Sequence, residues 1–275
     1  MIIFDELKTT FSSTGYAIIN TNLDEAVLDG AIADLNPYFG ADRQHPIHVP
    51  YADNGRVQDG WHISQNVLKV AQCPAIIEAI EGIYNAKARP FQTLNFYKGT
   101  EQRAHVDSIH FNSEPFGAMC GVWVALEDIG QEQGPLAYHS GSNRLPEMNY
   151  DYFDLESSSS NYDLYLECLH EVIDKNNFSL EHATIKKGQA LIWAANTIHG
   201  GAKQTNKELT RYSQVTHYYL GGAKAWRPSE STNSRFYFKP DWVQDVSNKP
   251  YKYPLPDPTF SQRVFDKLKR TFSGK

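Results

Sequence analysis

The feature that most constrains the fold is a series of short segments, rich in β-branched and aromatic residues, that runs from Phe91 to Leu220. Turn residues such as Lys186-Lys187-Gly188 separate these segments, and we expect about eight strands. Many short strands with frequent turns are typical of a jelly roll or barrel and not of a parallel sheet. The expected strands are 92–98, 104–109, 119–126, 135–139, 183–185, 189–194, 197–202 and 210–220.

Helical spacing dominates residues 1–90, which precede the strands. Apolar residues within Leu23–Leu35 recur at helical intervals after Thr21 and Asn22, which are suitable capping residues. Pro74–Tyr84 predicts a second amphipathic helix with a proline in its first turn. We therefore expect helices to flank a domain that is mainly β.

The strand series is interrupted by an acidic, tyrosine-rich insertion whose second half has helical spacing. Long insertions in compact domains are often functional, so this segment is a candidate lid. The sequence predicts one domain, described by the following ranges. It spans 1–275, with a helical flank at 1–90, a β core at 91–222, an insertion at 147–181 with a helix at 162–173, and an extension at 223–275 ending in a helix at 261–272.

Composition and charge argue against several classes of protein. The chain has 26 Lys and Arg against 32 Asp and Glu, giving a net charge of −6 without a basic stripe for nucleic acid or anionic lipid. Its longest apolar run, Met119–Leu126, is far shorter than the roughly 20 residues that span a bilayer. The first residues are acidic where a signal peptide needs basic ones. The isolated Cys73, Cys120 and Cys168 suit a reducing cytoplasm, where we expect the protein to act.

The strongest chemical signal combines His105-Val106-Asp107 with a distant histidine, His199. On a strand, positions i and i+2 point to the same face, so His105 and Asp107 can hold one ion. A lone His-x-Asp match is a weak signal, but His199 follows an apolar strand and precedes two glycines. Two histidines and one carboxylate form the facial triad of non-haem Fe(II) oxygenases. The set lacks the thiolates of a structural zinc site.

A candidate anion site lies twelve residues after His199, at Arg211-Tyr212-Ser213. On a strand, Arg211 and Ser213 would share a face. A guanidinium binds a carboxylate through two hydrogen bonds, and a hydroxyl adds one donor. The pair suits the distal carboxylate of a dicarboxylate such as 2-oxoglutarate.

Several spaced motifs resemble one known family, the phytanoyl-CoA dioxygenase-like proteins. Gly134–Arg144 (GPLAYHSGSNR) resembles the family's GPL…PGSHR segment, and Trp123–Asp128 resembles its W-x-A-L-x-D strand. Gln92–Lys98 resembles the strand that precedes HxD, and the resemblance extends over about Ile76–Leu220. It implies a double-stranded β-helix, a cupin-like jelly roll, that binds Fe(II) and 2-oxoglutarate and reacts with O₂.

The resemblance also implies roles for individual residues. His105, Asp107 and His199 would hold the iron, and Arg211 with Ser213 would hold the distal carboxylate of 2-oxoglutarate. Residues that match positions around the co-substrate are Trp123, Leu94 and Gln65. Halogenating relatives replace the carboxylate ligand with a small residue. Because Asp107 is present, the resemblance favours hydroxylation.

The sequence therefore predicts a dioxygenase that hydroxylates a small organic or natural-product substrate and releases succinate and CO₂. The charge near the expected mouth is acidic, which disfavours an acyl-CoA with its phosphates. Substrate contacts are expected from the loop after HxD, from 51–61 and from the insertion; the loop residues are Ser108, His110, Phe111 and Asn112. Two alternatives stay open: a non-catalytic metal-binding jelly roll, and a metal-dependent hydrolase or isomerase with the same ligands. No oligomeric state is predicted.

Overall fold

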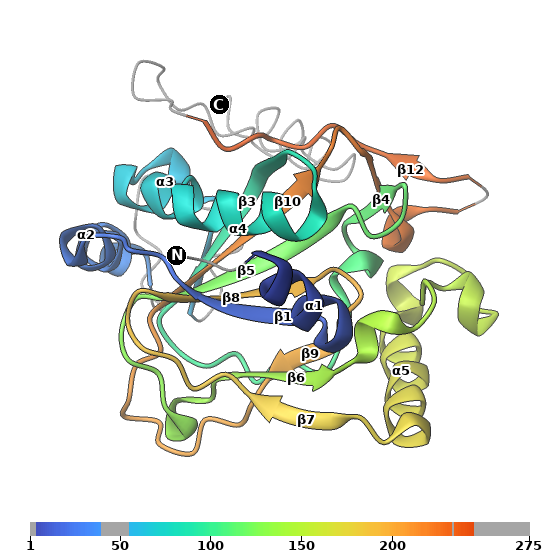
Figure 1. The fold of residues 1–275 in the computed structure, drawn as a ribbon. Coiled ribbons are helices and arrows are strands. Elements are labelled where there is room, and N and C mark those ends of the chain that lie inside the picture. Colours follow the sequence, from blue (N-terminus) through green and yellow to red (C-terminus); the bar gives the residue numbers. More distant parts are fainter. Residues whose placement is uncertain (1–3, 40–54, 233, 245–275) are drawn as a thin grey trace, which may run out of the picture. The chain divides into compact units, whose positions relative to one another are not determined.

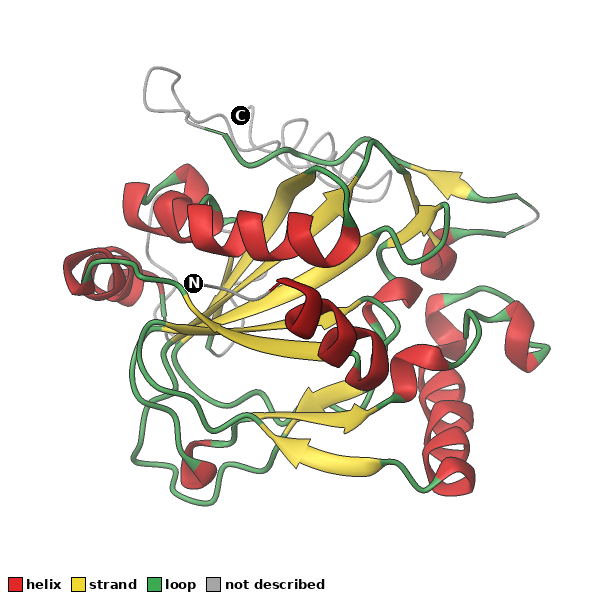
Figure 2. Ribbon diagram, viewed as in Figure 1, coloured by secondary structure: helices red, strands yellow, loops and turns green. Residues whose placement is uncertain are grey.

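The computed structural model describes residues 4–39, 55–232 and 234–244 (Figures 1 and 2). Its strands are β1 Tyr16–Asn20, β2 Arg56–Gln58, β3 Ala88–Phe96, β4 Asn112–Glu114, β5 Met119–Ala125, β6 Leu136–Ser140, β7 Ser179–His182, β8 Gln189–Ala194, β9 His199–Gly201, β10 Ser213–Leu220, β11 Lys224–Arg227 and β12 Phe236–Tyr237. Its α-helices are α1 Phe4–Thr14, α2 Glu25–Leu35, α3 Gln65–Ala71, α4 Pro74–Tyr84 and α5 Tyr162–Asn176.

Short 3₁₀ helices occupy many of the connections between these elements. Two of them, η3 and η8, border the functional site described below. The 3₁₀ helices are η1 Asn36–Tyr38, η2 Gly60–His62, η3 Asp107–Ile109, η4 Gln131–Gln133, η5 Ser142–Arg144, η6 Asp151–Phe153, η7 Ser159–Asn161 and η8 Pro228–Glu230.

The strands form three antiparallel sheets. The largest has the order β1-β8-β5-β10-β3-β2, and the two smaller sheets have the orders β7-β6-β9 and β12-β11-β4. Neighbours in the large sheet are far apart in sequence, as expected when a jelly roll winds its strands between two sheets.

The core lies between the large sheet and the β7-β6-β9 sheet. Trp123, Leu191 and Val215 lie opposite one another on neighbouring strands of the large sheet and share one buried cluster with Leu136 and Tyr138 of β6. Strands β5 and β10 are buried along their whole length, because α1, α3 and α4 cover the other face of this sheet (Figure 2). The predicted fold class, a mainly β jelly roll with flanking helices, is confirmed.

Several predicted elements agree closely with the structure. The predicted strand 189–194 and the predicted helix Pro74–Tyr84 have the bounds of β8 and α4. The predicted helix in the insertion is α5, which continues to Asn176. Its apolar side packs under the His105–Asp107 segment, in a cluster that includes Val106, Ile109 and Leu169.

Other expectations are wrong. Residues 104–109 are not a strand: His105 makes a single bridge with His199, and the chain then turns into η3 at Asp107. Residues 183–185 are not a strand either, since β7 ends at His182 and Ile185 makes only one bridge, with Ile129.

The region before the β core also differs from expectation. The helix α2 begins after Asp24, not directly after Thr21 and Asn22. Strand β1 was not predicted within the helical flank, and it pairs with β8 at the edge of the large sheet.

The described residues belong to one compact unit. The predicted helix at 261–272 lies outside the described residues, as do residues 51–54 of a predicted substrate region. One domain over the whole chain stays a prediction. None of the helices in the described ranges is long and apolar enough to cross a membrane.

Candidate metal centre and its cavity

The backbone brings the two histidines of the expected triad together. The N–H of His105 donates to the carbonyl of His199 at 2.8 Å, and the N–H of His199 donates back at 2.9 Å. The residue after His199 must be glycine, because a Cβ added at Gly200 would lie 2.6 Å from the Gln102 carbonyl oxygen. This close approach places two ligand side chains from segments 94 residues apart beside each other.

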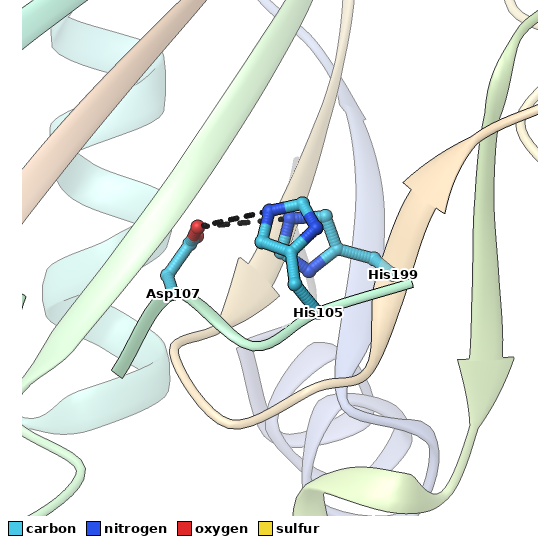
Figure 3. A group of neighbouring side chains, drawn as sticks. All are labelled: His105, Asp107 and His199. Carbon is cyan, nitrogen blue, oxygen red and sulfur yellow. Dashed lines mark ion pairs between the residues drawn. The ribbon is translucent and has the colours of Figure 1, made fainter. Parts of the chain in front are cut away.

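The three side chains converge in one buried cluster, shown in Figure 3. Asp107 Oδ1 lies 3.8 Å from His105 Nε2 and 3.7 Å from His199 Nε2. One candidate ligand atom from each residue lies within 4.8 Å of the others. The three atoms can therefore reach a single ion.

Hydrogen bonds fix the orientation of both imidazoles. His105 Nδ1 lies 2.9 Å from the carbonyl oxygen of Arg103, and His199 Nδ1 lies 2.9 Å from that of Thr197. A carbonyl oxygen only accepts, so each ring carries its proton on Nδ1 and presents the lone pair of Nε2 to the cluster. Two neutral imidazoles and one carboxylate form a donor set that fits a divalent metal such as iron.

The electrostatics of the cluster also favour a cation. Burial, together with the neighbouring His199, lowers the pKa of His105 to about 3, so this ring is neutral at ordinary pH. Burial raises the pKa of Asp107, but the surrounding imidazoles, His199 first, overcome this effect and hold it below its ordinary value. The cluster thus combines an ionised carboxylate with the unprotonated His105 ring, as a bound metal requires.

Arg211 lies in the same cavity as the triad and is 3 % exposed. Its Nη1 donates to the Gly134 carbonyl at 2.9 Å, while its Nε has no hydrogen-bond partner among the described residues. Burial lowers the pKa of Arg211 to about 10, so the guanidinium stays charged at neutral pH. No acidic side chain in the described part of the chain forms an ion pair with it. A buried cation without a carboxylate partner fits an anionic ligand.

A cavity of about 300 Å³ connects Arg211 with the triad. Of the residues predicted from the sequence, the cavity walls include the following: His105, Asp107, His199, Arg211, Trp123, Leu94, His110 and Phe111. The expected acidic mouth is wrong, because three arginines line the cavity against two carboxylates, Asp107 and Glu230.

Four predicted contacts do not line this cavity. Ser213 is buried and its hydroxyl donates to the Arg211 carbonyl at 3.3 Å. Gln65 is exposed at the start of α3. Asn112 is buried, and its side-chain N–H donates to Glu147 at 2.7 Å. Ser108 is buried in η3.

Sequence reasoning missed several residues of the cavity. On β10, Ser213, Val215 and His217 alternate with residues such as Gln214 and Tyr218 that contact α3, so the strand period could have placed His217 on the inner face. The same period places Trp193 with Leu191 on β8. The extension, from which no chemistry was expected, contributes residues at η8. Arg56 and Gln58 belong to the predicted substrate region 51–61, and the missed residues include Gln92, Gln102, Trp193, His217, Arg227, Ser229 and Glu230.

Fold and site together define a jelly-roll protein with two histidines, one carboxylate and a buried arginine in one cavity. The family model for phytanoyl-CoA dioxygenase (PhyH) matches residues 11–212, and the chain belongs to this family. The resemblance observed in the sequence is thereby confirmed.

Curated relatives agree with this assignment. A phytanoyl-CoA dioxygenase domain-containing protein 1 homolog of Caenorhabditis elegans is 25 % identical over 151 residues, which is 54 % of this chain and 47 % of the relative. Phytanoyl-CoA dioxygenase domain-containing protein 1 of Danio rerio is 25 % identical over 162 residues, 56 % of this chain and 47 % of the relative. These matches span about half the length of each relative.

Similar solved structures share the fold. The non-haem α-ketoglutarate-dependent carbocyclase SnoK from nogalamycin biosynthesis has a TM-score of 0.64 at 17 % identity, covering 85 % of this chain and 93 % of its own. The epimerase SnoN, in complex with Fe³⁺, α-ketoglutarate and nogalamycin RO, has a TM-score of 0.62 at 16 % identity, covering 92 % and 93 %. EctD from S. alaskensis, with 2-oxoglutarate and 5-hydroxyectoine, has a TM-score of 0.59 at 15 % identity, covering 82 % and 79 %.

Proposed function

We propose that this protein is an Fe(II)- and 2-oxoglutarate-dependent dioxygenase that hydroxylates a small organic substrate. The observation that carries this proposal is the buried Arg211, which has no acidic partner among the described residues and lies in one cavity with the His105–Asp107–His199 cluster. A non-catalytic metal site, or a hydrolase or isomerase with these ligands, has no need for a buried dicarboxylate anchor beside the metal.

The residues of the chain divide the work between them. His105, Asp107 and His199 would hold iron, which together with 2-oxoglutarate and O₂ supplies the oxidising chemistry when bound. Arg211 binds and orients the distal carboxylate of 2-oxoglutarate by charge-assisted hydrogen bonds.

Part of the cavity wall beside Arg211 is apolar. Leu94, Phe96, Leu136 and Val215 line the cavity there, and the rings of Phe96 and Trp123 lie 5.6 and 5.7 Å from the guanidinium carbon. These side chains keep water from the ion pair, which strengthens the attraction between Arg211 and its ligand.

Hydroxylation is proposed over halogenation because Asp107 occupies the position that a halide would need. Similar folds in SnoK and SnoN serve a carbocyclase and an epimerase, so the reaction is a property of the substrate pocket as well as of the metal.

We place the protein in the cytoplasm, since its three cysteines, Cys73, Cys120 and Cys168, form no disulfide.

An anaerobic titration tests the proposal. Metal-free protein receives Fe(II) and then 2-oxoglutarate, and the weak visible charge-transfer band of a chelated 2-oxo acid is recorded. We expect the band in the wild type and in Arg235→Ala, a surface control, and a much weaker band in Arg211→Ala. Bound metal without a band in the wild type would instead favour the non-catalytic or hydrolase alternative.

A further inference from the structure

Four residues lie in one row across the large sheet, beneath the metal centre. Trp193 on β8 lies opposite Gly121 on β5, Gly121 lies opposite His217 on β10, and His217 lies opposite Gln92 on β3. The side chains of Trp193, His217 and Gln92 line the cavity. The sheet thus presents an ordered polar row to the underside of the triad.

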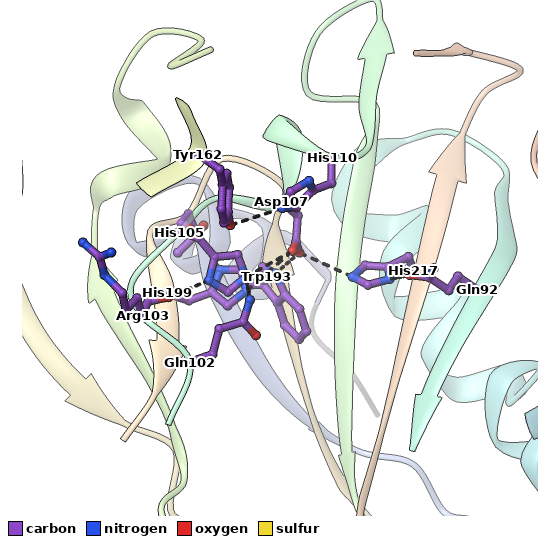
Figure 4. Close-up of polar contacts among 11 residues, drawn as sticks. Gln92, Gln102, Arg103, His105, Asp107, His110, Tyr162, Trp193, His199 and His217 are labelled. Carbon is purple, nitrogen blue, oxygen red and sulfur yellow. Dashed lines mark hydrogen bonds and ion pairs between the residues drawn. The ribbon is translucent and has the colours of Figure 1, made fainter. Parts of the chain in front are cut away.

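This row contacts only one oxygen of the Asp107 carboxylate (Figure 4). Trp193 Nε1 donates to Asp107 Oδ2 at 2.7 Å, and His217 Nε2 lies 3.5 Å from the same oxygen. The other ring nitrogen of His217 lies 3.0 Å from Gln92 Oε1, which fixes the ring. Asp107 Oδ1 instead faces the two histidines of the triad.

Gly121 is the position that makes the row possible. A Cβ added at Gly121 would lie 2.2 Å from the Trp193 ring, because the indole lies directly over this residue. Only glycine leaves room for the ring between β5 and the carboxylate. The absence of a side chain at Gly121 therefore places the Trp193 N–H under Asp107.

We infer that this row is a positioning device that reserves Asp107 Oδ2 and leaves Oδ1 as the single oxygen for the metal. The inference rests on the proposed function. Aspartate can bind a metal through one oxygen or two. A second bond from Asp107 would occupy one of the positions that the facial triad leaves open for small ligands. Trp193 and His217 act through Asp107 and are positioning residues.

The test counts the water molecules on Mn(II) bound in place of iron, by electron paramagnetic resonance line broadening in ¹⁷O-enriched water. Octahedral Mn(II) on three protein ligands keeps three waters. We expect three in the wild type and two in Trp193→Phe and His217→Leu, where Oδ2 is released to the metal. The affinity for Mn(II) should also change in these variants, by up to about 10–100-fold.

Trp61→Phe is the matched control, since Trp61 is buried, lies outside the cavity lining and has no contact with Asp107. It should keep three waters. Either variant that folds, binds Mn(II) and still shows three waters overturns the inference, whereas a purely structural role would lower thermal stability without changing the count. The water count needs no 2-oxoglutarate. The inference can therefore hold even if the protein does not bind 2-oxoglutarate and the proposed function is wrong.

Discussion

The two ends of the cavity are built in different ways. Around Arg211 the walls are strands, with Leu94 on β3, Trp123 on β5 and Val215 on β10 in one cross-strand row. Around His110 the neighbours come from η8 and from the first residue of α5. Ser229 of η8 lies 3.4 Å from one ring nitrogen of His110, and Tyr162 of the insertion lies 3.2 Å from the other.

The arginines at the two ends of the cavity also differ in their ion-pair partners. Arg211 has no acidic partner in the described ranges, whereas Arg227 at the other end pairs with Glu230 at 2.5 Å and lies over the Phe238 ring at 4.4 Å. Arg211 is therefore ready for an anion, while the charge of Arg227 is already balanced. The strands therefore supply walls beside Arg211, whereas Arg211 itself, His105 and Asp107 lie outside the named strands.

The largest effect is expected where the two ends meet. Asp107→Ala should remove metal binding and lower 2-oxoglutarate turnover by more than about 100-fold, the upper range for loss of an outer-shell partner. Metal content and succinate release measure this. Asp163→Ala, an exposed carboxylate on α5, is the control and should retain both. Retained turnover in Asp107→Ala would contradict the assigned ligand set.

The strand-built end is tested by Arg211→Met. We expect the Kd for 2-oxoglutarate to rise about 100-fold, because the charge-assisted pair contributes about 3 kcal/mol. The same variant should be as stable as the wild type or more stable without ligands, since it removes a buried charge. Calorimetry and thermal unfolding measure both effects. A large loss of stability with unchanged 2-oxoglutarate binding would show that Arg211 is structural.

The buried His105, which lies between the two ends of the cavity, should make the metal-free protein less stable in acid. The pKa of His105 is about 3 when folded and near 6.5 when unfolded. Between these pH values, His105 binds a proton in the unfolded chain but not in the folded protein. Stability is therefore highest above pH 6.5 and falls toward pH 3, by about 1.4 kcal/mol per pH unit. Urea unfolding at several pH values in this window measures how the free energy of unfolding changes with pH. This change per pH unit should be smaller in His105→Asn than in the wild type. An equal change in both proteins would contradict the assignment.

The smallest effect is expected at the end of the cavity around His110, where Tyr162 is replaced. Burial raises the pKa of Tyr162 to about 12, so its hydroxyl, 3.2 Å from His110 Nε2, stays protonated at neutral pH. Tyr162→Phe should lower the free energy of unfolding by about 1 kcal/mol, as for one hydrogen bond, and leave the Kd for 2-oxoglutarate unchanged. Leu164→Ala, an exposed residue of α5, serves as control. A weakened 2-oxoglutarate affinity in Tyr162→Phe would remove the distinction between the two ends.

The sequence predicted the parts of the site that depend on local patterns. Apolar runs predicted β5 and β8, and the spacing of His105, Asp107, His199 and Arg211 indicated residues that the structure brings into one cavity. The strand predicted around His105 failed because apolar alternation there reflects packing against the insertion, not pairing in a sheet.

What could not be predicted depends on contacts across strands. The strand period could place His217 on the inner face, but not beside Gly121 and within 3.5 Å of Asp107. Gln65 was placed by resemblance alone, without a geometric argument, and it lies on the surface. Arg227 and Glu230 enter the cavity from an extension whose sequence carries no recognisable motif.

The pairing of β1 with β8 has a consequence for synthesis of the chain. Asn20 and Gln189, which lie opposite each other at one end of this pair, are 169 residues apart, so β1 leaves the ribosome long before its partner exists. The two triad histidines are separated in the same way. Such non-local pairing slows folding and leaves strand edges open to wrong partners during translation. The metal site therefore forms only after residue 199 has been made, and the nascent chain cannot capture its metal earlier through all three ligands.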